Sequence, residues 1–412
     1  MRVLVIGKGG REHALAQKIS ESRQLEKIWV APGNPGMQQS GFECVAVEKT
    51  FDVLSFCKSE LVDLVVLGPE GAILSDLKQT LENAGISCLA PIPEAAQLES
   101  SKVFCKKILS SAQVKTAAFE IAKDLESAQS LIVKHNFSKP LVIKADGLAQ
   151  GKGVAVCESA ERAFPEAQSL SSAYGFPLLF EECLIGKELS AFALCDGEDF
   201  VMLGTACDYK RITANPFSAN TGGMGAYSPC DFISEADEKE ISEIFRKTLK
   251  ALKRNDTPFV GFLFAGLMLT AEGLYVLEYN VRMGDPETQA LLPRIESDFL
   301  DLAVKAVQGR LKNQKVEFLP QESVHVVAVS GGYPQSEMQL GHPIKVPEEM
   351  LENAQIYFAG VAKKNESLIN SGGRVLGITA LADNRAQARE VAYQMIRKVE
   401  FSGRYFREDI AL

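Results

Sequence analysis

The segment LEYNVR, which starts at Leu277, combines oxygen ligands for a divalent cation with a positive side chain. Alternation along a strand puts Glu278, Asn280 and Arg282 on one face. Leu277 and Tyr279 then lie on the opposite, apolar face. A carboxylate and an amide oxygen suit Mg²⁺ on a nucleotide, and a guanidinium can bind a carboxylate or phosphate through two hydrogen bonds. The alternative is an amphipathic edge strand that faces water.

A glycine-rich turn near the N-terminus could bind phosphate. Gly7 to Gly10 (GKGG) follows the apolar stretch Val3 to Ile6 and precedes a helix, so its backbone N–H groups could hold a phosphate at the helix N-terminus. The alternative is a tight turn that needs glycine only for its dihedral angles. A dinucleotide fingerprint requires glycine where Glu12 stands, and the second strand ends without an acidic residue, so NAD binding is not expected.

A second glycine-rich segment lies between two short strands. Pro140 to Lys144 and Val154 to Cys157 are predicted strands, which makes KADGLAQGKGV a hairpin tip that can lie over phosphates. Lys144, at the end of the first strand, would supply a point charge for phosphate oxygens. The spacing of a Walker A loop is absent. A flexible basic hairpin is the alternative.

Acidic side chains follow the predicted strand Leu178 to Phe180. Backbone groups near Glu181 and Glu182 could hydrogen-bond an adenine, and a carboxylate there or at Glu188 could accept hydrogen bonds from ribose hydroxyls. A solvated strand end would explain the same residues without a ligand.

Four further segments each have a functional and a structural explanation. The loop Asn220 to Ala226 (NTGGMGA) contains three glycines that would let the backbone approach a ligand, or it is a surface loop. Asp208 to Arg211 could face a substrate or form a surface charge cluster. Asp285 is a predicted helix N-cap before Pro286, and we also expect it to serve a substrate. Arg374, in SGGRV, could bind a phosphate or belong to a turn.

Short strands that alternate with helices place these residues in an α/β protein. Strands are predicted at 3–6, 28–31 and 64–67, with helices at 12–22 and 74–84, and this alternation predicts a parallel sheet whose strand ends form a crevice. We expect an N-terminal α/β domain over 1–100 and a second domain over 101–310 that includes a subdomain at about 115–185. After it, we expect a separate, small, strand-rich α/β domain over 320–412.

The composition excludes several classes of protein. Hydrophobic residues make up 46% of the 412-residue chain and charged residues 24%, which is typical of a globular protein and not of a disordered or collagen-like one. No apolar run is long enough for a membrane helix, so we expect a cytoplasmic protein without a membrane partner. A net charge of −9 argues against nucleic acid as a partner. Nine cysteines without a CxxC pair and four scattered histidines favour reduced thiols and an oxygen-ligated metal.

Taken together, these segments resemble the ATP-grasp ligases and, among them, the phosphoribosylamine–glycine ligase family. The likeness runs nearly end to end, through GKGGREHA at 7–14, APGNPG at 31–36, GPE at 68–70, Ser101-Lys102, KADGLAQGKGV at 144–154, NTGGMGAYSP at 220–229, EYNVRMGDPETQ at 278–289 and GGRV at 372–375. Lys8 stands where asparagine is common in the family, and Tyr209 where histidine is usual. The resemblance implies a Rossmann-like N-terminal domain, a two-part ATP-grasp domain and a small C-terminal domain.

The resemblance also implies an activity and a set of site residues. The activity is the ATP-dependent ligation of glycine to 5-phosphoribosylamine through glycyl phosphate, the second step of de novo purine synthesis. ATP would be bound by Lys102, Lys144, Gly147, Gly151, Lys152, Gly153, Glu181, Glu182, Leu184 and Glu188, and Mg²⁺ or Mn²⁺ by Glu278 and Asn280. The substrates would be bound by Gly9, Gly10, Arg11, Glu12, Asn220, Thr221, Gly222, Gly223, Arg282 and Arg374, with Arg282, Asp208 and Asp285 as catalytic candidates.

Other functions remain open at this point. A ligase or carboxylase that acts on another purine intermediate would use the same ATP chemistry, and only the acceptor would differ. A regulatory protein that senses nucleotides would bind ATP without turning it over, although the Glu278 and Asn280 pair favours an enzyme. A nicotinamide-dependent dehydrogenase fits the sequence least. We expect a monomer whose partners are small molecules.

Overall fold

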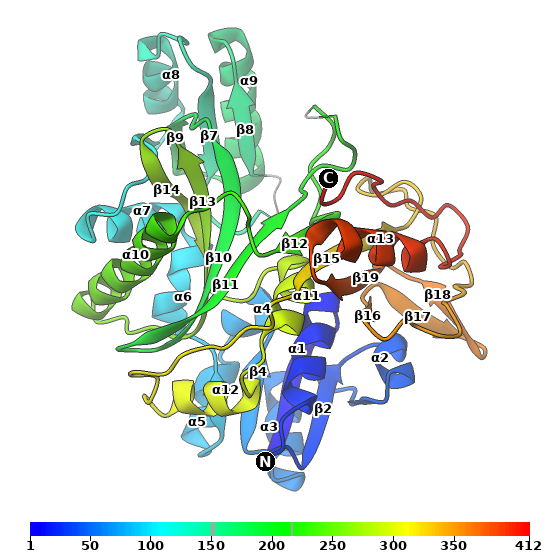
Figure 1. Cartoon of the computed structure of the whole chain (residues 1–412). Helices are drawn as coiled ribbons and strands as arrows, with labels where there is room; N and C mark the ends of the chain where they lie inside the picture. Colours follow the sequence, from blue (N-terminus) through cyan, green and yellow to red (C-terminus); the bar gives the residue numbers. More distant parts are fainter. Residues whose placement is uncertain (150–152, 216) are drawn as a thin grey trace.

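The computed structural model describes residues 1–149, 153–215 and 217–412, and it begins with a parallel sheet covered by helices (Figure 1). The sheet has the order β3-β2-β1-β4-β5, and all its strands are parallel. Its elements are β1 (Arg2–Gly7), α1 (Gly10–Ser20), β2 (Lys27–Pro32), α2 (Pro35–Gln39), β3 (Glu43–Cys44), α3 (Thr50–Ser59), β4 (Leu64–Leu67), α4 (Glu70–Ile73), α5 (Leu77–Asn83), β5 (Ser87–Leu89) and α6 (Pro93–Ser100). The predicted parallel sheet is confirmed.

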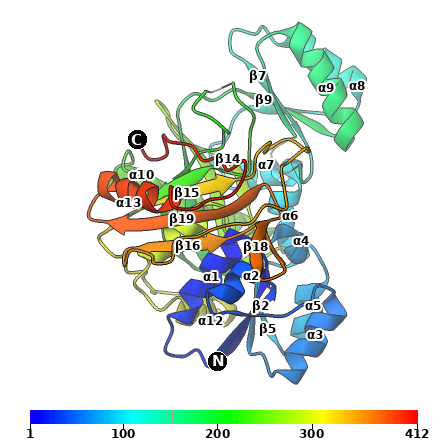
Figure 2. The same ribbon diagram turned by 90° about the vertical axis from the view of Figure 1, so that its right-hand side faces the viewer.

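A small subdomain projects from the rest of the molecule, as Figure 2 shows. It follows α7 (Lys102–Ser111) and contains β6 (Phe119–Ala122), α8 (Leu125–Lys134), β7 (Leu141–Ala145), β8 (Val154–Cys157), α9 (Ala160–Tyr174) and β9 (Leu178–Glu182). Its four strands have the order β6-β9-β7-β8, and α8 and α9 share an apolar core with them. The hairpin that the sequence predicts around the second glycine-rich segment is present, because β7 and β8 pair antiparallel.

The rest of the chain forms one large antiparallel sheet with helices on it. Its order is β14-β13-β10-β11-β12-β15-β19-β16. The elements are β10 (Lys187–Asp196), β11 (Phe200–Asp208), β12 (Gly225–Ser228), α10 (Glu235–Arg254), β13 (Val260–Thr270), β14 (Gly273–Asn280), α11 (Glu287–Leu291), the 3₁₀ turn η1 (Leu292–Arg294), α12 (Phe299–Val307), β15 (Glu322–Val329), β16 (Ala354–Phe358), β17 (Val361–Lys364), β18 (Ser367–Asn370), β19 (Arg374–Ala382) and α13 (Arg385–Ile396).

The C-terminal strands differ from the sequence analysis in one respect. We expected a separate strand-rich region, but β15 pairs with β12 along Gly225–Ser228, so the C-terminal strands extend the sheet of the middle region. Only β17 and β18 form a small sheet apart from it. Strand pairing between residues nearly a hundred positions apart leaves no local signal in the sequence, which is why the pattern did not indicate this continuity.

The N-terminal sheet is packed firmly against the middle region. One apolar cluster joins Val3 and Leu15 of the N-terminal part to Phe192 on β10 and Phe299 on α12. Asn34 connects the N-terminal turn to the C-terminal strands by hydrogen bonds. Its Nδ2 donates to the carbonyl oxygens of Lys8 (2.9 Å) and Phe358 (3.2 Å). The first glycine-rich turn is therefore fixed against the C-terminal strands as well as against its own sheet.

Two histidines are buried within this packing. His13 and His325 are each 1% exposed. Nδ1 of His13 accepts the N–H of Phe358 at 3.0 Å, and Nδ1 of His325 is 2.8 Å from Oγ1 of Thr379. Burial lowers the pKa of each imidazole to about 3. Both rings are therefore neutral in the folded protein near neutral pH.

We expect these histidines to make the protein sensitive to mild acid. An unfolded histidine binds a proton below pH ~6.5 and the buried ones do not until about pH 3, so the free energy of unfolding falls as the pH drops between these values. The slope is about 1.4 kcal/mol per pH unit for each histidine. Urea unfolding between pH 7.5 and 5 measures it. His325→Gln should reduce the slope relative to the unsubstituted protein, and an unchanged slope would contradict the prediction.

Candidate active site

The predicted metal ligands lie at the end of β14. The Glu278 side chain is exposed, Asn280 is half-buried, and Tyr279 between them is buried, with its hydroxyl 2.7 Å from that of Thr248. The predicted common face of Glu278 and Asn280 is thus seen. The position of Leu277 is not as expected: Glu278 pairs with Gly266 and Val276 with Leu267, so Leu277 is the extra residue of a β-bulge and Val276 is buried instead.

Arg282 joins this strand end to the N-terminal region. Its Nη2 lies 2.9 Å from Oε1 of Glu99 and 3.1 Å from Oδ1 of Asn280, and its Nε lies 3.5 Å from Oε2 of Glu70. Glu99 also accepts the N–H of Val281 at 2.9 Å. Burial raises the pKa of Glu99, and the nearby guanidinium opposes that shift. A ligand carboxylate that binds Arg282 would have to share the guanidinium with Glu99.

Glu99 was not found from the sequence. It stands near the end of α6, 183 residues away from its partner Arg282, and one acidic residue on a helix carries no signal of such a contact.

A buried carboxylate holds two lysines beside the hairpin. Glu181 is 3% exposed, and it lies 2.7 Å from Nζ of Lys144 and 3.1 Å from Nζ of Lys106. Burial alone would lower the pKa of Lys144, but the adjacent carboxylate raises it above its usual range. For Lys106 the effect of burial prevails and the pKa is lowered. Glu181 is therefore no solvated strand end, and Lys144 remains charged.

Lys106 is the second residue that the sequence analysis missed. It follows the predicted phosphate ligand Lys102 by four positions on α7, so the two lysines lie on one face of the helix. That spacing could have indicated it. Lys102 donates to the carbonyl oxygen of Gly147 at 2.9 Å, and burial lowers its pKa while Glu278 opposes the shift. The hairpin tip, the first lysine and the predicted metal ligands are thus close together.

We expect Glu181→Leu to destabilise the fold strongly. Removal of the carboxylate leaves Lys106 and Lys144 as unpaired charges in a buried site, which costs about 3–5 kcal/mol of the free energy of unfolding. Urea unfolding measures the loss. The matched control is Glu182→Leu. Among the described residues this half-buried neighbour accepts one hydrogen bond, from the N–H of Ala118 at 3.2 Å, and its loss should cost about 0.5–1.5 kcal/mol. Equal losses in the two variants would contradict the pairing.

The other predicted ATP residues surround this group. Glu188 is paired with Nζ of Lys210 at 2.6 Å, and Lys210 also lies 3.3 Å from Oδ1 of Asp208. Leu184 is half-buried in the loop between β9 and β10. At the hairpin tip, Gly147 adopts φ +101°, a left-handed conformation that favours glycine.

The remaining hairpin residues are only partly described. Gly153 is buried directly before β8, the second strand of the hairpin. Gly151 and Lys152, which the sequence analysis also assigned to ATP, lie outside the described residues.

Glu287 is a buried acid that the sequence analysis did not assign. It is 4% exposed and accepts a hydrogen bond from Oγ of Ser190 at 3.2 Å. Burial, and then the negative charge of Asp208, raise its pKa to about 7. The arrangement places two carboxyl groups near each other beside Lys210 and Arg282, so this part of the site can hold or exchange a proton near neutral pH.

The predicted substrate residues of the C-terminal part meet around Asp285. Its carboxylate binds Arg374 through both oxygens, at 3.2 Å and 3.0 Å, and accepts from Nε2 of Gln289 at 2.8 Å. Burial would raise the pKa of Asp285, but Arg374 and Arg11 more than offset it, and the pKa is lowered. The N-cap prediction for Asp285 is wrong, because α11 begins later with Pro286 at the cap position.

The glycine loop of the middle region lies against the same group. Gly222 accepts from Nη1 of Arg374 at 2.6 Å, and its N–H donates to the hydroxyl of Tyr333 at 2.8 Å. Thr221 binds the carbonyl oxygen of Lys210 through its N–H at 2.8 Å, and Asn220 is exposed. A Cβ on Gly223 would lie 2.3 Å from Pro286, so this position requires glycine. Tyr333 carries no sequence signal that we recognised.

In the N-terminal turn, the glycines lie against two buried charged side chains, Arg11 and Glu12. Glu12 accepts from the N–H of Gly9 at 2.7 Å and from Nε of Arg11 at 2.6 Å, and both side chains are nearly fully buried. Arg11 also donates to the carbonyl oxygen of Met283 at 3.2 Å. These two side chains therefore hold the turn in place. A Cβ on Gly10 would lie 2.7 Å from Nε2 of Gln289, so Gly10 permits close packing on α11.

The donor set agrees with a nucleotide-bound Mg²⁺ or Mn²⁺. Within 1–149, 153–215 and 217–412 there is no cluster of three histidine, cysteine or acidic side chains that could hold a metal by itself. The carboxylate of Glu278 and the amide oxygen of Asn280 would fill two coordination positions of the metal. The others would be left to phosphate oxygens and water, which is how Mg²⁺ is usually bound.

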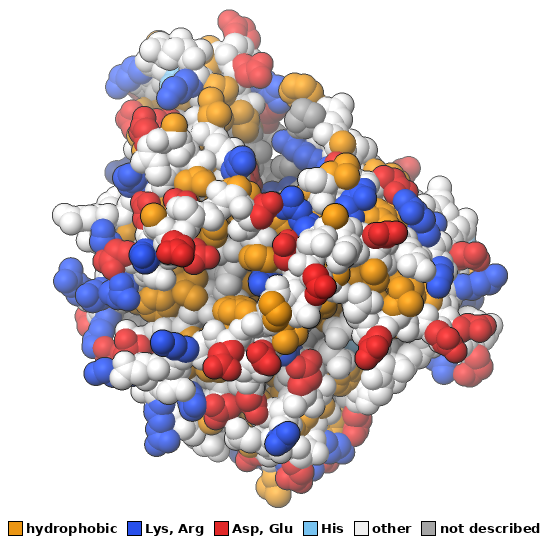
Figure 3. All heavy atoms as spheres, viewed as in Figure 1, with side chains coloured by type: hydrophobic (Ala, Val, Ile, Leu, Met, Phe, Trp, Pro, Cys, Tyr) orange, Lys and Arg blue, Asp and Glu red, His pale blue; other side chains and the backbone are white. Residues whose placement is uncertain are grey.

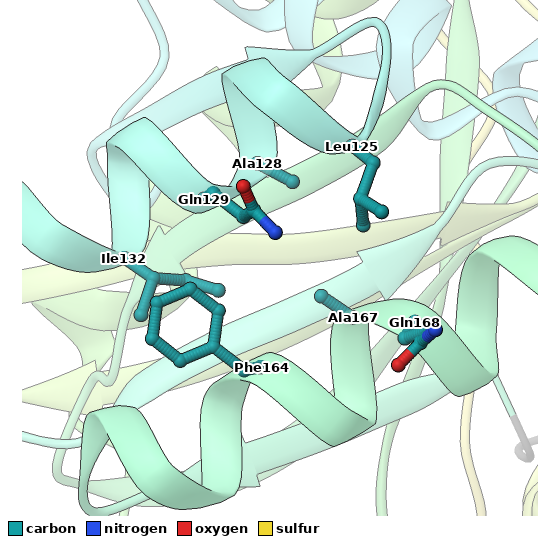
Figure 4. Close-up of a pocket in the computed structure, with 7 residues that line it drawn as sticks. All are labelled: Leu125, Ala128, Gln129, Ile132, Phe164, Ala167 and Gln168. Atoms are coloured by element: carbon teal, nitrogen blue, oxygen red, sulfur yellow. The ribbon is translucent and has the colours of Figure 1, made fainter.

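The surface views agree with a site beneath the subdomain. Figure 3 shows the surface hollowed between the subdomain and the C-terminal part, with Lys and Arg side chains at the margin. A separate pocket of about 100 Å³ lies between α8 and α9 (Figure 4). It is lined mainly by apolar side chains such as Leu125, Ile132 and Phe164, and none of its lining residues is a predicted site residue.

Among the residues that the structure describes, no helix is long and apolar enough to cross a membrane.

The chain matches three family models in sequence order. Residues 1–99 match the N domain of phosphoribosylglycinamide synthetase, 100–288 its ATP-grasp (A) domain and 323–412 its C domain. Curated relatives named phosphoribosylamine–glycine ligase include one from Caldanaerobacter subterraneus, 41% identical over 100% of this chain and 99% of the relative. Another, from Rhizobium meliloti, is 39% identical over 100% of this chain and 98% of the relative.

Solved structures give the same result. The crystal structure of phosphoribosylamine–glycine ligase from Thermotoga maritima has a TM-score of 0.86 and 35% identity, with 100% of both chains covered. A biotin carboxylase from Campylobacter jejuni has a TM-score of 0.77 at 14% identity, over 98% of this chain and 92% of the other, which shows a shared fold alone. The chain therefore belongs to the phosphoribosylglycinamide synthetase family and has its N, ATP-grasp and C domains in that order.

Proposed function

We propose that the protein ligates glycine to 5-phosphoribosylamine at the expense of ATP, the second step of de novo purine synthesis. The observation that carries this proposal is the end-to-end family match to relatives that bear the name of this activity. The geometry supports it, since lysines, two metal-type oxygen ligands and glycine loops meet at one place.

The first chemical step requires activation of the glycine carboxylate. One of its oxygens attacks the γ-phosphorus of ATP, ADP leaves, and glycyl phosphate is formed. Lys102 and Lys144 would stabilise the negative charge on the transferring phosphoryl group, and Arg282 would orient the carboxylate. Mg²⁺ or Mn²⁺ held by Glu278 and Asn280 would neutralise phosphate charge.

The adenosine would lie beside the lysines of the hairpin. Backbone groups near Glu182 and Leu184 would receive the adenine, and Glu188 would accept from the ribose. Glu181 would act by holding Lys144. Gly147 to Gly153 would cover the phosphates.

The second step forms the amide bond. The amine nitrogen of phosphoribosylamine attacks the acyl carbon, phosphate leaves, and the nitrogen loses a proton. Asp208 and Asp285 are the candidates that would hold the substrate ammonium or hydroxyl groups. The hairpin would close before transfer, because water that reached glycyl phosphate would hydrolyse it.

The acceptor substrate would lie between the N-terminal and C-terminal parts. We place its phosphate between the backbone of Gly9 and Gly10 and the Arg374 side chain, with Asn220 to Gly223 closing over it. Arg11 and Glu12 would contribute by fixing the turn, since their side chains bind each other. We further propose that the enzyme works as a monomer in the cytoplasm.

ADP release by the purified protein tests this function. ATP and Mg²⁺ are supplied with glycine and freshly generated phosphoribosylamine, and each is omitted in turn. We expect release to require both substrates, with glycinamide ribonucleotide formed in equal amount. No release from protein shown to bind ATP would point to another acceptor or to a nucleotide sensor and would remove the proposal.

A further inference from the structure

Tyr209 contacts the C-terminal segment of the chain. It directly follows β11, and its phenolic oxygen accepts the backbone N–H of Ala411 at 2.9 Å. The guanidinium of Arg407 lies 5.0 Å from the centre of the tyrosine ring and donates to the carbonyl oxygen of Arg211 at 2.9 Å. Arg407 and Ala411 therefore contact the residues on both sides of Lys210, namely Arg211 and Tyr209.

The C-terminal segment is itself held rigidly. Arg407 binds Asp409 through two hydrogen bonds of 2.8 Å and 2.5 Å. The hydroxyl of Tyr393 accepts the N–H of Ile410 at 3.1 Å, and Nε of Arg389 donates to the carbonyl oxygen of Ile410 at 3.0 Å. Ala411 is 4% exposed. A segment anchored at so many points can fix the strand end that it contacts.

The neighbours of Tyr209 face the site already described. Strand geometry directs Asp208 and Lys210 to the side opposite Tyr209, and Nζ of Lys210 binds Asp208 at 3.3 Å and Glu188 at 2.6 Å. The backbone of Tyr209 is paired on both sides, with its N–H on Gly225 at 3.0 Å and its carbonyl oxygen on the N–H of Met224 at 2.8 Å. The hydrogen bond between the phenol and Ala411 adds a further anchor to this stretch, which carries Asp208 and Lys210.

We infer that Tyr209 is a positioning residue, through which the C-terminal segment 407–411 fixes Asp208 and Lys210 for binding of the amino-acid substrate. The inference rests on the proposed function for the identity of that substrate as glycine. The phenol suits this role because it ends in an oxygen that accepts the N–H of Ala411.

Steady-state kinetics of Tyr209→Phe test this role. The substitution keeps the ring beneath Arg407 and removes only the oxygen that binds Ala411. We expect the KM for glycine to rise about three- to tenfold, the effect of one lost hydrogen bond, with little change in kcat. A merely structural role would lower the fraction of folded enzyme and leave the KM unchanged. Tyr357→Phe is the matched control, because it removes another buried phenolic oxygen, which contacts Gln355 on β16, four strands away from β11 in the sheet.

Arg407→Gln provides a second variant that acts through the same segment. We expect it to raise the KM for glycine as Tyr209→Phe does, and the double variant to show less than the product of the two effects. An unchanged KM in the folded variants would overturn the positioning role while leaving the ligase activity in place. If the wild type shows no glycine-dependent ADP release, the proposed function fails, and the inference fails with it. If Tyr209→Phe does not fold, Arg407→Gln alone decides.

Discussion

Replacement of both Glu278 and Asn280 by alanine is expected to lower turnover by about 10²- to 10⁴-fold, because charge neutralisation by the metal contributes several kcal/mol to phosphoryl transfer. The fold should survive, since Glu278 is exposed and Asn280 only half-buried. Initial rates of ADP release and the midpoint of thermal unfolding measure the two effects. The loss should appear mainly in kcat, since it concerns the transition state.

One conservative variant and one control sharpen this prediction. Asn280→Asp keeps a hard oxygen ligand and should retain more activity than Asn280→Ala. Glu272→Ala removes an exposed acid from the same hairpin of strands, close to the turn at Gly273, and should leave turnover unchanged. Near-normal activity of a properly folded Glu278→Ala, Asn280→Ala double variant would remove the metal assignment.

The sequence was sufficient to predict the elements that local patterns determine. The parallel N-terminal sheet, the hairpin of β7 and β8 and the polar face of Glu278 and Asn280 all follow from periodicity and turn residues a few positions apart. The order of the glycine-rich segments indicated the family, and the comparisons confirm it. The individual roles of the site residues remain predictions.

Contacts across long stretches of chain were not predictable in the same way. The pairing of Arg282 with Glu99 joins residues 183 positions apart, and the pairing of β12 with β15 joins the middle region to the C-terminal strands. The β-bulge at Leu277 shifts the alternation by one residue, which a strict period of two cannot represent. Asp285 stands before a proline, as an N-cap residue often does. In the structure Pro286 is the cap of α11, and the Asp285 carboxylate pairs with Arg374 instead.

These long-range contacts explain why the site is spread over the whole chain. Arg282 touches acids from the N-terminal region, and Asp285 touches an arginine from the C-terminal strands. Three separately patterned regions therefore meet at residues 280–289. If the substrates bind there, as proposed, their contacts would depend on the relative positions of all three regions.

The Lys144→Met variant should lose turnover by about 10²- to 10³-fold while it stays folded, since one preorganised charge beside a transferring phosphoryl group is worth about 3–4 kcal/mol. The fold survives because Glu181 keeps Lys106 at 3.1 Å as its counter-ion, and methionine replaces the apolar stem of the lysine. Glu181→Leu should by contrast lower the free energy of unfolding strongly, because it leaves two unpaired charges.

The matched control for Lys144→Met is Lys106→Met. In that variant Glu181 keeps Lys144 at 2.7 Å, so the lysine predicted to reach the phosphate remains and turnover should fall less than tenfold. Rates of ADP release, with unfolding measured on the same samples, compare the two. Because both lysines bind one carboxylate, similar losses of stability with very different losses of turnover would assign the phosphate contact to Lys144. Equal losses of turnover would instead mean that the two lysines act only by neutralising Glu181.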